Sequence, residues 1–223
     1  MPRRQRYSGS DNPSDGGAPR FGRDNPERME SPVWEELVRT GETAFAARRR
    51  LGVQTGAPMW CFSRFGMSET PLPDGRTAFI GGEHEDYYDP DFYIYNDVIV
   101  RHPDDRIEIY GYPRSTFPPT DFHSATLVGD AIIVIGSLGY AKERDPLRTP
   151  AFRLDLRTYR MEQLDTGRPN PGWIHKHSAE LDGRVIRVSG GQRVEQHGAE
   201  MKIVANTQVY NLHTDRFRWR RVD

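Results

Sequence analysis

Acidic and tyrosine side chains concentrate in one short segment, residues 83–91. Its sequence, Glu-His-Glu-Asp-Tyr-Tyr-Asp-Pro-Asp, places five carboxylates within nine residues. Clustered carboxylate oxygens suit a hard divalent cation such as Ca²⁺, and the same negative charge could receive a basic peptide. The spacing matches no established calcium-binding loop. The segment therefore leaves three interpretations open: a metal site, a surface for a basic partner, or a solvated loop.

Three histidines suggest a second kind of chemistry. His123 and His177 occupy equivalent places in a repeated pattern, and His175 shares a strand face with His177 because side chains alternate with a period of two. If the fold brings these imidazole nitrogens close together, they could bind a transition metal. Histidine at such positions can equally be a structural hydrogen-bonding group. A divalent metal at His123, His175 and His177 is therefore one hypothesis, set against a structural role.

Signatures of other catalytic classes are missing from the sequence. There is no Gly-x-Ser-x-Gly elbow, no phosphate-binding glycine loop and no nucleophilic Cys-His signature. The single cysteine, Cys61, excludes an intrachain disulfide framework and a multi-cysteine zinc site. These residues predict no cofactor, and they favour a binding protein over an enzyme.

Composition restricts the class of protein. The 223 residues include 31 basic and 32 acidic side chains, so a net charge of −1 gives no steering toward nucleic acid. No apolar stretch approaches the length of a membrane-spanning helix, and no apolar core follows residues 1–6 as a signal peptide would require. With 21 Gly and 17 Pro the chain is rich in turns. We expect a cytoplasmic globular protein without a membrane or nucleic-acid partner.

Two segments precede the repetitive part of the chain. Residues 1–30 have almost no apolar anchors, which predicts a disordered tail. The segment 31–57 opens on Ser31, a suitable N-cap, and is followed by a helix-forming stretch with an apolar stripe. It predicts one α-helix over 32–51, with a break at Gly41 as the alternative, and then a linker.

From residue 58 the sequence repeats itself. Two series of glycines recur every 54 residues, one within turn motifs and one seven residues later at the end of apolar runs. Each repeat contains four short strand patterns, and such units with a period near 50 are typical of propeller blades. Three units are predicted, over about 58–115, 116–168 and 169–223. The glycines are Gly75, Gly129 and Gly183 in the first series, and Gly82, Gly136 and Gly190 in the second.

The repeated residues resemble the kelch repeat. The second unit departs from the pattern, with Asp121 near the position of the arginine and Ser137 in place of a glycine. The resemblance implies an all-β fold, a kelch-type β-propeller with three four-stranded blades per chain, similar to the central domain of galactose oxidase. The matching residues are Pro58, Arg64, Gly66, Ser68, Gly81-Gly82 and Asn96-Asp97 in the first unit, and His177-Ser178, Gly190-Gly191, Tyr210 and Trp219 in the third.

The resemblance also implies where a ligand would bind. In kelch propellers, the loops after the second and fourth strands emerge on one face, here 83–91, 137–149, 192–206, 114–122 and 167–175. We expect a non-catalytic module that recognises a protein or small ligand there. The alternative is a metal-dependent enzyme using the inner histidines or the acidic loop; Cys61 lacks the surroundings of a copper oxidase site. The expected lining is Arg64, Glu83, Asp86, Tyr87, Tyr88, Arg114, Asp121, Tyr140, Trp173, His175 and Arg193.

Three blades are fewer than the four to eight of typical propellers. Leaving roughly 500 Å² of apolar blade surface in water would lose about 12 kcal/mol of hydrophobic stabilisation, at about 25 cal/mol per Å². We therefore expect a homodimer in which two three-blade halves close a six-blade ring, with the 32–51 helix at the seam. A covering N-terminal segment, a different partner chain and a relic half-propeller are the alternatives.

Overall fold

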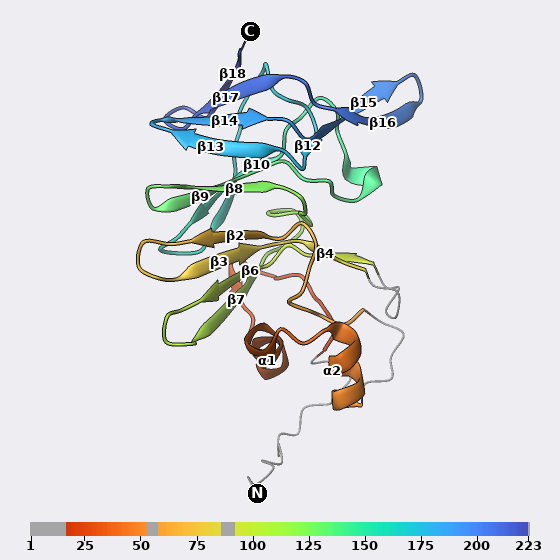
Figure 1. The fold of residues 1–223 in the computed structure, drawn as a ribbon, viewed down its shortest axis with the longest axis vertical. Helices are drawn as coiled ribbons and strands as arrows, with labels where there is room; N and C mark the ends of the chain where they lie inside the picture. Colours follow the sequence, from red (N-terminus) through yellow and green to blue (C-terminus); the bar gives the residue numbers. More distant parts are fainter. Residues whose placement is uncertain (1–16, 53–57, 86–91, 223) are drawn as a thin grey trace, which may run out of the picture.

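The structure, a computed structural model, describes residues 17–52, 58–85 and 92–222. They form a mainly β protein with two helices, in which antiparallel sheets are stacked in chain order along the long axis (Figure 1). The helices lie at the N-terminal end of the stack and the C-terminus at the other end.

The first sheet has five strands in the order β1-β7-β6-β3-β2. The second has the order β11-β10-β9-β8, and the third β13-β14-β17-β18. The strands of the first sheet are β1 (Glu27–Arg28), β2 (Ser68–Pro71), β3 (Thr77–Ile80), β6 (Val98–Arg101) and β7 (Ile107–Gly111). Those of the second are β8 (Ser124–Val128), β9 (Ala131–Ile135), β10 (Ala151–Asp155) and β11 (Met161–Gln163). Those of the third are β13 (Ser178–Asp182), β14 (Val185–Ser189), β17 (Val209–His213) and β18 (Arg218–Val222).

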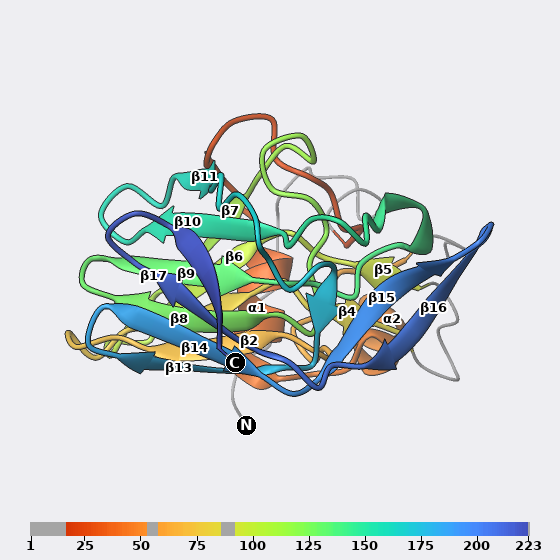
Figure 2. The ribbon, with the colours of Figure 1, turned by 90° about the horizontal axis from the view of Figure 1, so that it is seen from above.

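Small elements gather at one end of the three sheets, which we call the loop face (Figures 1 and 2). The tight hairpins that join the strands lie at the other end, the hairpin end. The last hairpin, β15–β16, projects well beyond the rest of the loop face (Figure 2). The loop-face elements are β4 (Glu83–His84), β5 (Tyr93–Ile94), the 3-10 helix η1 (Ala141–Glu143), β12 (Ile174–His175), β15 (Gln192–His197) and β16 (Glu200–Ala205).

A repeated backbone contact joins successive sheets where each innermost strand begins. The amide of Phe122 donates to the carbonyl of Gly66 at 2.8 Å, and the amide of Lys176 donates to the carbonyl of Phe122 at 2.8 Å. All three residues have a positive φ, of 63°, 48° and 54° for Gly66, Phe122 and Lys176. The neighbouring first strands β2, β8 and β13 are thus held by the same connection at each step.

The 54-residue spacing holds between the second and third sheets but not between the first and second, where the equivalent residues Ser68 and Ser124 are 56 positions apart. Ser68 pairs with Ile80, twelve residues later, whereas Ser124 pairs with Ile135, eleven residues later. The first hairpin is therefore one residue longer, and Gly81, not Gly82, is the counterpart of Gly136. This matters because a one-residue shift moves a side chain to the other face of its strand.

The predicted single helix over 32–51 is two helices, α1 (Pro32–Thr40) and α2 (Ala44–Leu51). Gly41 ends α1 with φ of 65°, a left-handed conformation that glycine adopts at little cost. Ser31 accepts a hydrogen bond from the amide of Trp34 at 3.3 Å and so acts as the N-cap. The break at Gly41 is thus the alternative that the structure adopts.

Residues 17–30 differ from the predicted disordered tail; residues 1–16 lie outside the described part. Strand β1 pairs with β7, and the amide of Gly22 donates to the carbonyl of Tyr112 at 3.1 Å. A Cβ on Gly22 would lie 2.3 Å from the carbonyl carbon of Gly111, so the close approach requires glycine. Backbone pairing orders this segment, and composition does not reveal it.

The helices cover the outer face of the first sheet. Trp34 of α1 stacks on Trp60 with ring centroids 5.0 Å apart and an interplanar angle of 6°. Leu37 and Ile109 are buried in the same cluster, at 0% and 1% exposure. The N-terminal end of the stack therefore has a cover supplied by its own chain.

The outer face of the third sheet is polar. Its inner face is apolar, with Ile186, Leu212 and Trp219 buried against the second sheet. The intervening positions form a cross-strand row of charged and amide side chains. The predicted apolar surface is thus not found at this end. The row consists of Glu180, Arg187, Asn211 and Arg220, and all except Asn211 are exposed.

Among the described residues, neither helix is long and apolar enough to cross a bilayer.

Candidate functional site

The eleven residues predicted to line the loop face separate into several environments. Asp86, Tyr87 and Tyr88 lie outside the described residues. The other eight belong to a core ion pair, a groove between the first two sheets, a buried carboxylate site, strand β12, the start of η1 and the β15–β16 hairpin.

Arg64 lies in the core of the first sheet rather than on a surface. Its side chain is 0% exposed, and its two terminal nitrogens bind the two carboxylate oxygens of Asp97 at 2.5 and 3.0 Å. The guanidinium lies near the rings of Trp60 and Tyr95, at 4.8 and 3.4 Å from their centroids. Such planar, bidentate pairing is the usual role of a buried arginine. The side chain therefore stabilises the sheet and does not reach a ligand on the loop face.

Two predicted residues, Arg114 and Trp173, line a cavity of about 390 Å³ between the first and second sheets. Arg114 forms an ion pair with Glu143, and its guanidinium lies 5.6 Å from the ring centroid of Tyr140. The indole nitrogen of Trp173 donates to the carbonyl of Leu138 at 3.2 Å, which fixes the ring. Prolines and an aromatic ring complete the apolar wall: Pro118, Pro119, Pro150 and Phe152.

A second cavity, of about 350 Å³, adjoins the first. Arg148 and Gln163 line both, and we call the two adjacent cavities together the sheet-2 groove. Its far end is polar, with Thr166, Arg168 and Asn170. Arg148 and Arg168 fall within loops predicted to bind, but no motif singled them out. The sequence could have pointed to them only by their position in those loops.

A buried carboxylate lies beside this groove. Asp121 is 0% exposed, and its Oδ1 accepts hydrogen bonds from the amide of Gly139 at 2.6 Å and the hydroxyl of Ser137 at 3.2 Å. Ser137 is itself a lining residue of the groove. The repeat therefore uses Asp121 and Ser137, the two departures from the kelch pattern, to fix the loop that follows β9.

The carboxyl of Glu83 interacts with that of Asp121. Burial raises the pKa of Glu83 to about 7, and the negative charge of Asp121 and a hydrogen bond between the two carboxyls act in the same direction. The charge of Lys176 opposes them. Among the described residues, the buried Oδ2 of Asp121 has no hydrogen-bond partner in the structure. Glu83 thus exchanges a proton near neutral pH on the loop face.

The three histidines remain neutral at pH 7. Burial lowers the pKa of His123 to about 3 and the pKa values of His175 and His177 to about 4. His175 is 1% exposed, and neither of its ring nitrogens has a hydrogen-bond partner among the residues that the structure describes. His123 and His177 each bind a serine of the preceding sheet. Within residues 17–52, 58–85 and 92–222, no three His, Cys, Asp or Glu side chains are arranged to hold a metal ion.

Tyr140 and Arg193 serve local contacts. The hydroxyl of Tyr140 accepts a hydrogen bond from the amide of Ile94 at 3.1 Å, which ties η1 to β5. Arg193, on β15, forms an ion pair with Glu195 on the same strand.

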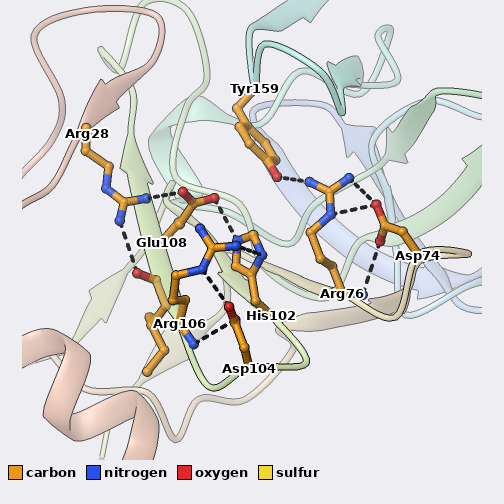
Figure 3. A network of polar contacts seen from close by, with 9 residues as sticks. Arg28, Asp74, Arg76, His102, Asp104, Arg106, Glu108 and Tyr159 are labelled. Carbon is orange, nitrogen blue, oxygen red and sulfur yellow. Dashed lines mark hydrogen bonds and ion pairs between the residues drawn. The ribbon is translucent and has the colours of Figure 1, made fainter.

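A separate polar network lies at the hairpin end (Figure 3). Glu108 binds His102 at 2.9 Å and Arg28 at 3.3 Å, so it connects β1 to the β6–β7 hairpin. Arg76 contacts both Asp74 and the hydroxyl of Tyr159, which links the first and second sheets. These groups satisfy one another, and we assign them to structure rather than to a site.

Comparison with known proteins identifies a structural relative. No protein-family model matches the sequence, and no curated protein matches it. The solved structure of YjhT resembles this chain with a TM-score of 0.52 at 12% sequence identity, over 72% of this chain and 52% of that chain. The chain thus spans about half the length of YjhT. At this identity the likeness concerns the fold alone, and together with the antiparallel sheets it fits a β-propeller.

Proposed function

We propose that the chain is a kelch-type β-propeller unit of three four-stranded blades and that it is a binding module. The sheet-2 groove is the proposed binding site. It combines an apolar wall with charged side chains, as ligand sites generally do. The groove carries the proposal because it brings Arg114 and Trp173, from two of the predicted binding loops, to one cavity.

Two further features support the propeller assignment. The same backbone contact joins Gly66 to Phe122 and Phe122 to Lys176, so the sheets follow one another by a repeated step. Connections after the second strands emerge at one end, as in blades whose loops form a binding face (Figure 1). The size of the groove suits a small molecule or a short chain segment rather than a folded partner.

A blocking substitution tests the binding site. Gln163 is exposed and lines both cavities, so Gln163→Trp fills the groove without changing the core. Glu162→Trp is the matched control, because Glu162 is the exposed neighbour on β11 and points to the other face.

The readout is a set of nitrogen–proton NMR spectra of the full chain, titrated with benzamide, benzyl alcohol and benzoate. We expect at least one probe to shift the indole signal of Trp173 in the unmodified chain and in Glu162→Trp but not in Gln163→Trp. Shifts confined to the hairpin end, or equal shifts in both variants, would overturn the proposal.

A further inference from the structure

The charged side chains that line the sheet-2 groove have a formal net charge of zero, but they differ in whether they have an ion-pair or hydrogen-bond partner. Three are basic and three are acidic. Whether the groove selects a charged ligand depends on which of them still have free hydrogen-bonding capacity. The six are Arg114, Arg148, Arg168, Glu143, Asp145 and Asp165.

Arg114 and Glu143 neutralise each other. They form an ion pair, and the guanidinium of Arg114 also lies near the rings of Phe21 and Tyr140, at 5.2 and 5.6 Å from the centroids. This pair lies at the apolar end of the groove, and its two charges offset each other.

Asp145 and Asp165 hold turns in their own loops. Asp145 accepts a hydrogen bond from the amide of Leu147 at 2.9 Å, and Asp165 accepts one from the amide of Gly167 at 3.2 Å. The backbone carbonyl of Asp165 also accepts from Arg218, which brings a further positive charge to this rim. The carboxylates are thus engaged by backbone amides, which is the usual role of aspartate in tight turns.

Arg148 and Arg168 are different, because their guanidinium groups have no ion pair or hydrogen bond within the described part of the chain. Both are exposed, and both line the same cavity of about 350 Å³. A guanidinium presents a fork of donors that matches a carboxylate or phosphate group. Two such forks facing one cavity provide a receptor for an anionic group.

The opposite end of the groove is apolar. Phe152 is 2% exposed and Trp173 is 9% exposed, so their surfaces form a rigid wall. Arg148 and Gln163 are shared by the two cavities and therefore lie where the polar and apolar ends meet. A molecule that fills the groove would have an anionic end near the arginines and an apolar body near the aromatic rings.

We propose that the sheet-2 groove binds a small organic anion, with Arg148 and Arg168 holding its carboxylate or phosphate group and Phe152 and Trp173 contacting its apolar body. This inference rests on the proposed binding function and specifies its ligand class. It predicts that charge and apolar surface are both needed for binding.

The test compares five probes on the full chain by calorimetry and NMR. Benzoate and phenyl phosphate combine the two features, benzamide and benzyl alcohol lack the charge, and inorganic phosphate lacks the apolar body. We expect benzoate or phenyl phosphate to bind about tenfold more tightly than benzamide and inorganic phosphate. The better of the two anions then distinguishes a carboxylate from a phosphate site.

Two variants and a control locate the effect. Arg148→Gln and Arg168→Gln are each expected to weaken binding of the preferred anion about tenfold, whereas Arg157→Gln, an exposed arginine on the β10–β11 turn, removes the same charge and should leave it within about twofold. Equal binding of benzamide and benzoate would overturn the inference while leaving the binding function intact. Equal losses in all three variants would also overturn it, since they would indicate a general charge effect.

Discussion

Nε2 of His177 lies 2.9 Å from Oγ of Ser124, and the same hydrogen bond, at 2.8 Å, joins His123 to Ser68. In each case the histidine is at the start of one innermost strand and the serine is at the start of the preceding one. The contact is therefore a repeated connection between neighbouring sheets. It supports the structural role for these two histidines, which the sequence had left open against a metal site.

Removing one of these connections should destabilise the fold. His177→Ala leaves the hydroxyl of Ser124 without its partner, so we expect a loss of about 1–3 kcal/mol in the free energy of unfolding. Urea unfolding measures it. In a double-mutant cycle with Ser124→Ala the two losses should be clearly less than additive. Strict additivity would show that the hydrogen bond contributes nothing.

Acid should destabilise the protein through two buried histidines, His175 and His177. The pKa values of His175 and His177 are about 4 in the folded chain, below the ordinary value of 6.5, because both are buried. The unfolded chain then binds more protons between these values, so stability present above about pH 6.5 is lost as pH falls toward about 4. Urea midpoints at about pH 8, 6 and 5 should decline, and His177→Gln should show a shallower decline. An equal slope in this variant would count against His177 as the cause.

Glu83 should act in the opposite direction. Its pKa of about 7 in the folded chain exceeds the ordinary value of 4.5, so the folded state binds the extra proton. Its contribution to stability is complete below about pH 4.5 and declines as pH rises through about 7. Glu83→Gln keeps a donor toward Asp121 without the charge.

The gain from Glu83→Gln should be on the order of 1 kcal/mol at about pH 8 and near zero at about pH 5, a modest value because water screens this partly exposed carboxyl. Urea unfolding at the two pH values measures it. Glu162→Gln is the control, because Glu162 is an exposed carboxyl that takes no part in raising the pKa of Glu83. A gain of the same size at both pH values would exclude a shared proton as its origin.

The sequence predicted what depends on local pattern. The repeated turns, the alternating strands and the helix break at Gly41 each depend on residues that are close together in the sequence. It did not predict the pairing of residues 27–28 with β7, because an edge strand is recognised by an unpaired backbone edge and not by composition. Nor did it show that Arg64 is buried, since the arginine of a repeat motif can point to a surface or to a carboxylate such as Asp97.

The residues that line the groove could not be predicted from the sequence, for a related reason. Its lining comes from segments separated by up to about sixty positions along the chain, and only packing of the first two sheets brings Arg114 near Arg148 and Trp173. Arg148 has no ion pair or hydrogen bond among the described residues, and this can be recognised only once the contacts of the surrounding side chains are known. The loops that carry the groove were predictable, but the choice of residues within them was not.

The buried ion pair of Arg64 should matter for stability more than for binding. Arg64→Met leaves Asp97 as an uncompensated charge in the core, for which we expect a loss of about 3–5 kcal/mol. Arg106→Met breaks an ion pair whose two side chains are 64% and 61% exposed, so it should change the free energy of unfolding far less than Arg64→Met does. Thermal and urea unfolding compare them. A small loss for Arg64→Met would mean that the ion pair is not needed to stabilise the first sheet.

The predicted homodimeric ring meets an obstacle in the third sheet. Ring closure requires the outer face of this sheet to pack on the other subunit, but the cross-strand row there includes Glu180, Arg187 and Arg220. Burying unpaired charges is costly, and the helices already cover the outer face of the first sheet. We therefore expect light scattering at micromolar concentration to give the mass of one chain, 25.6 kDa. A mass twice as large that returns to one chain in Arg187→Glu would instead establish the ring, because the row would then be part of a charge-complementary seam.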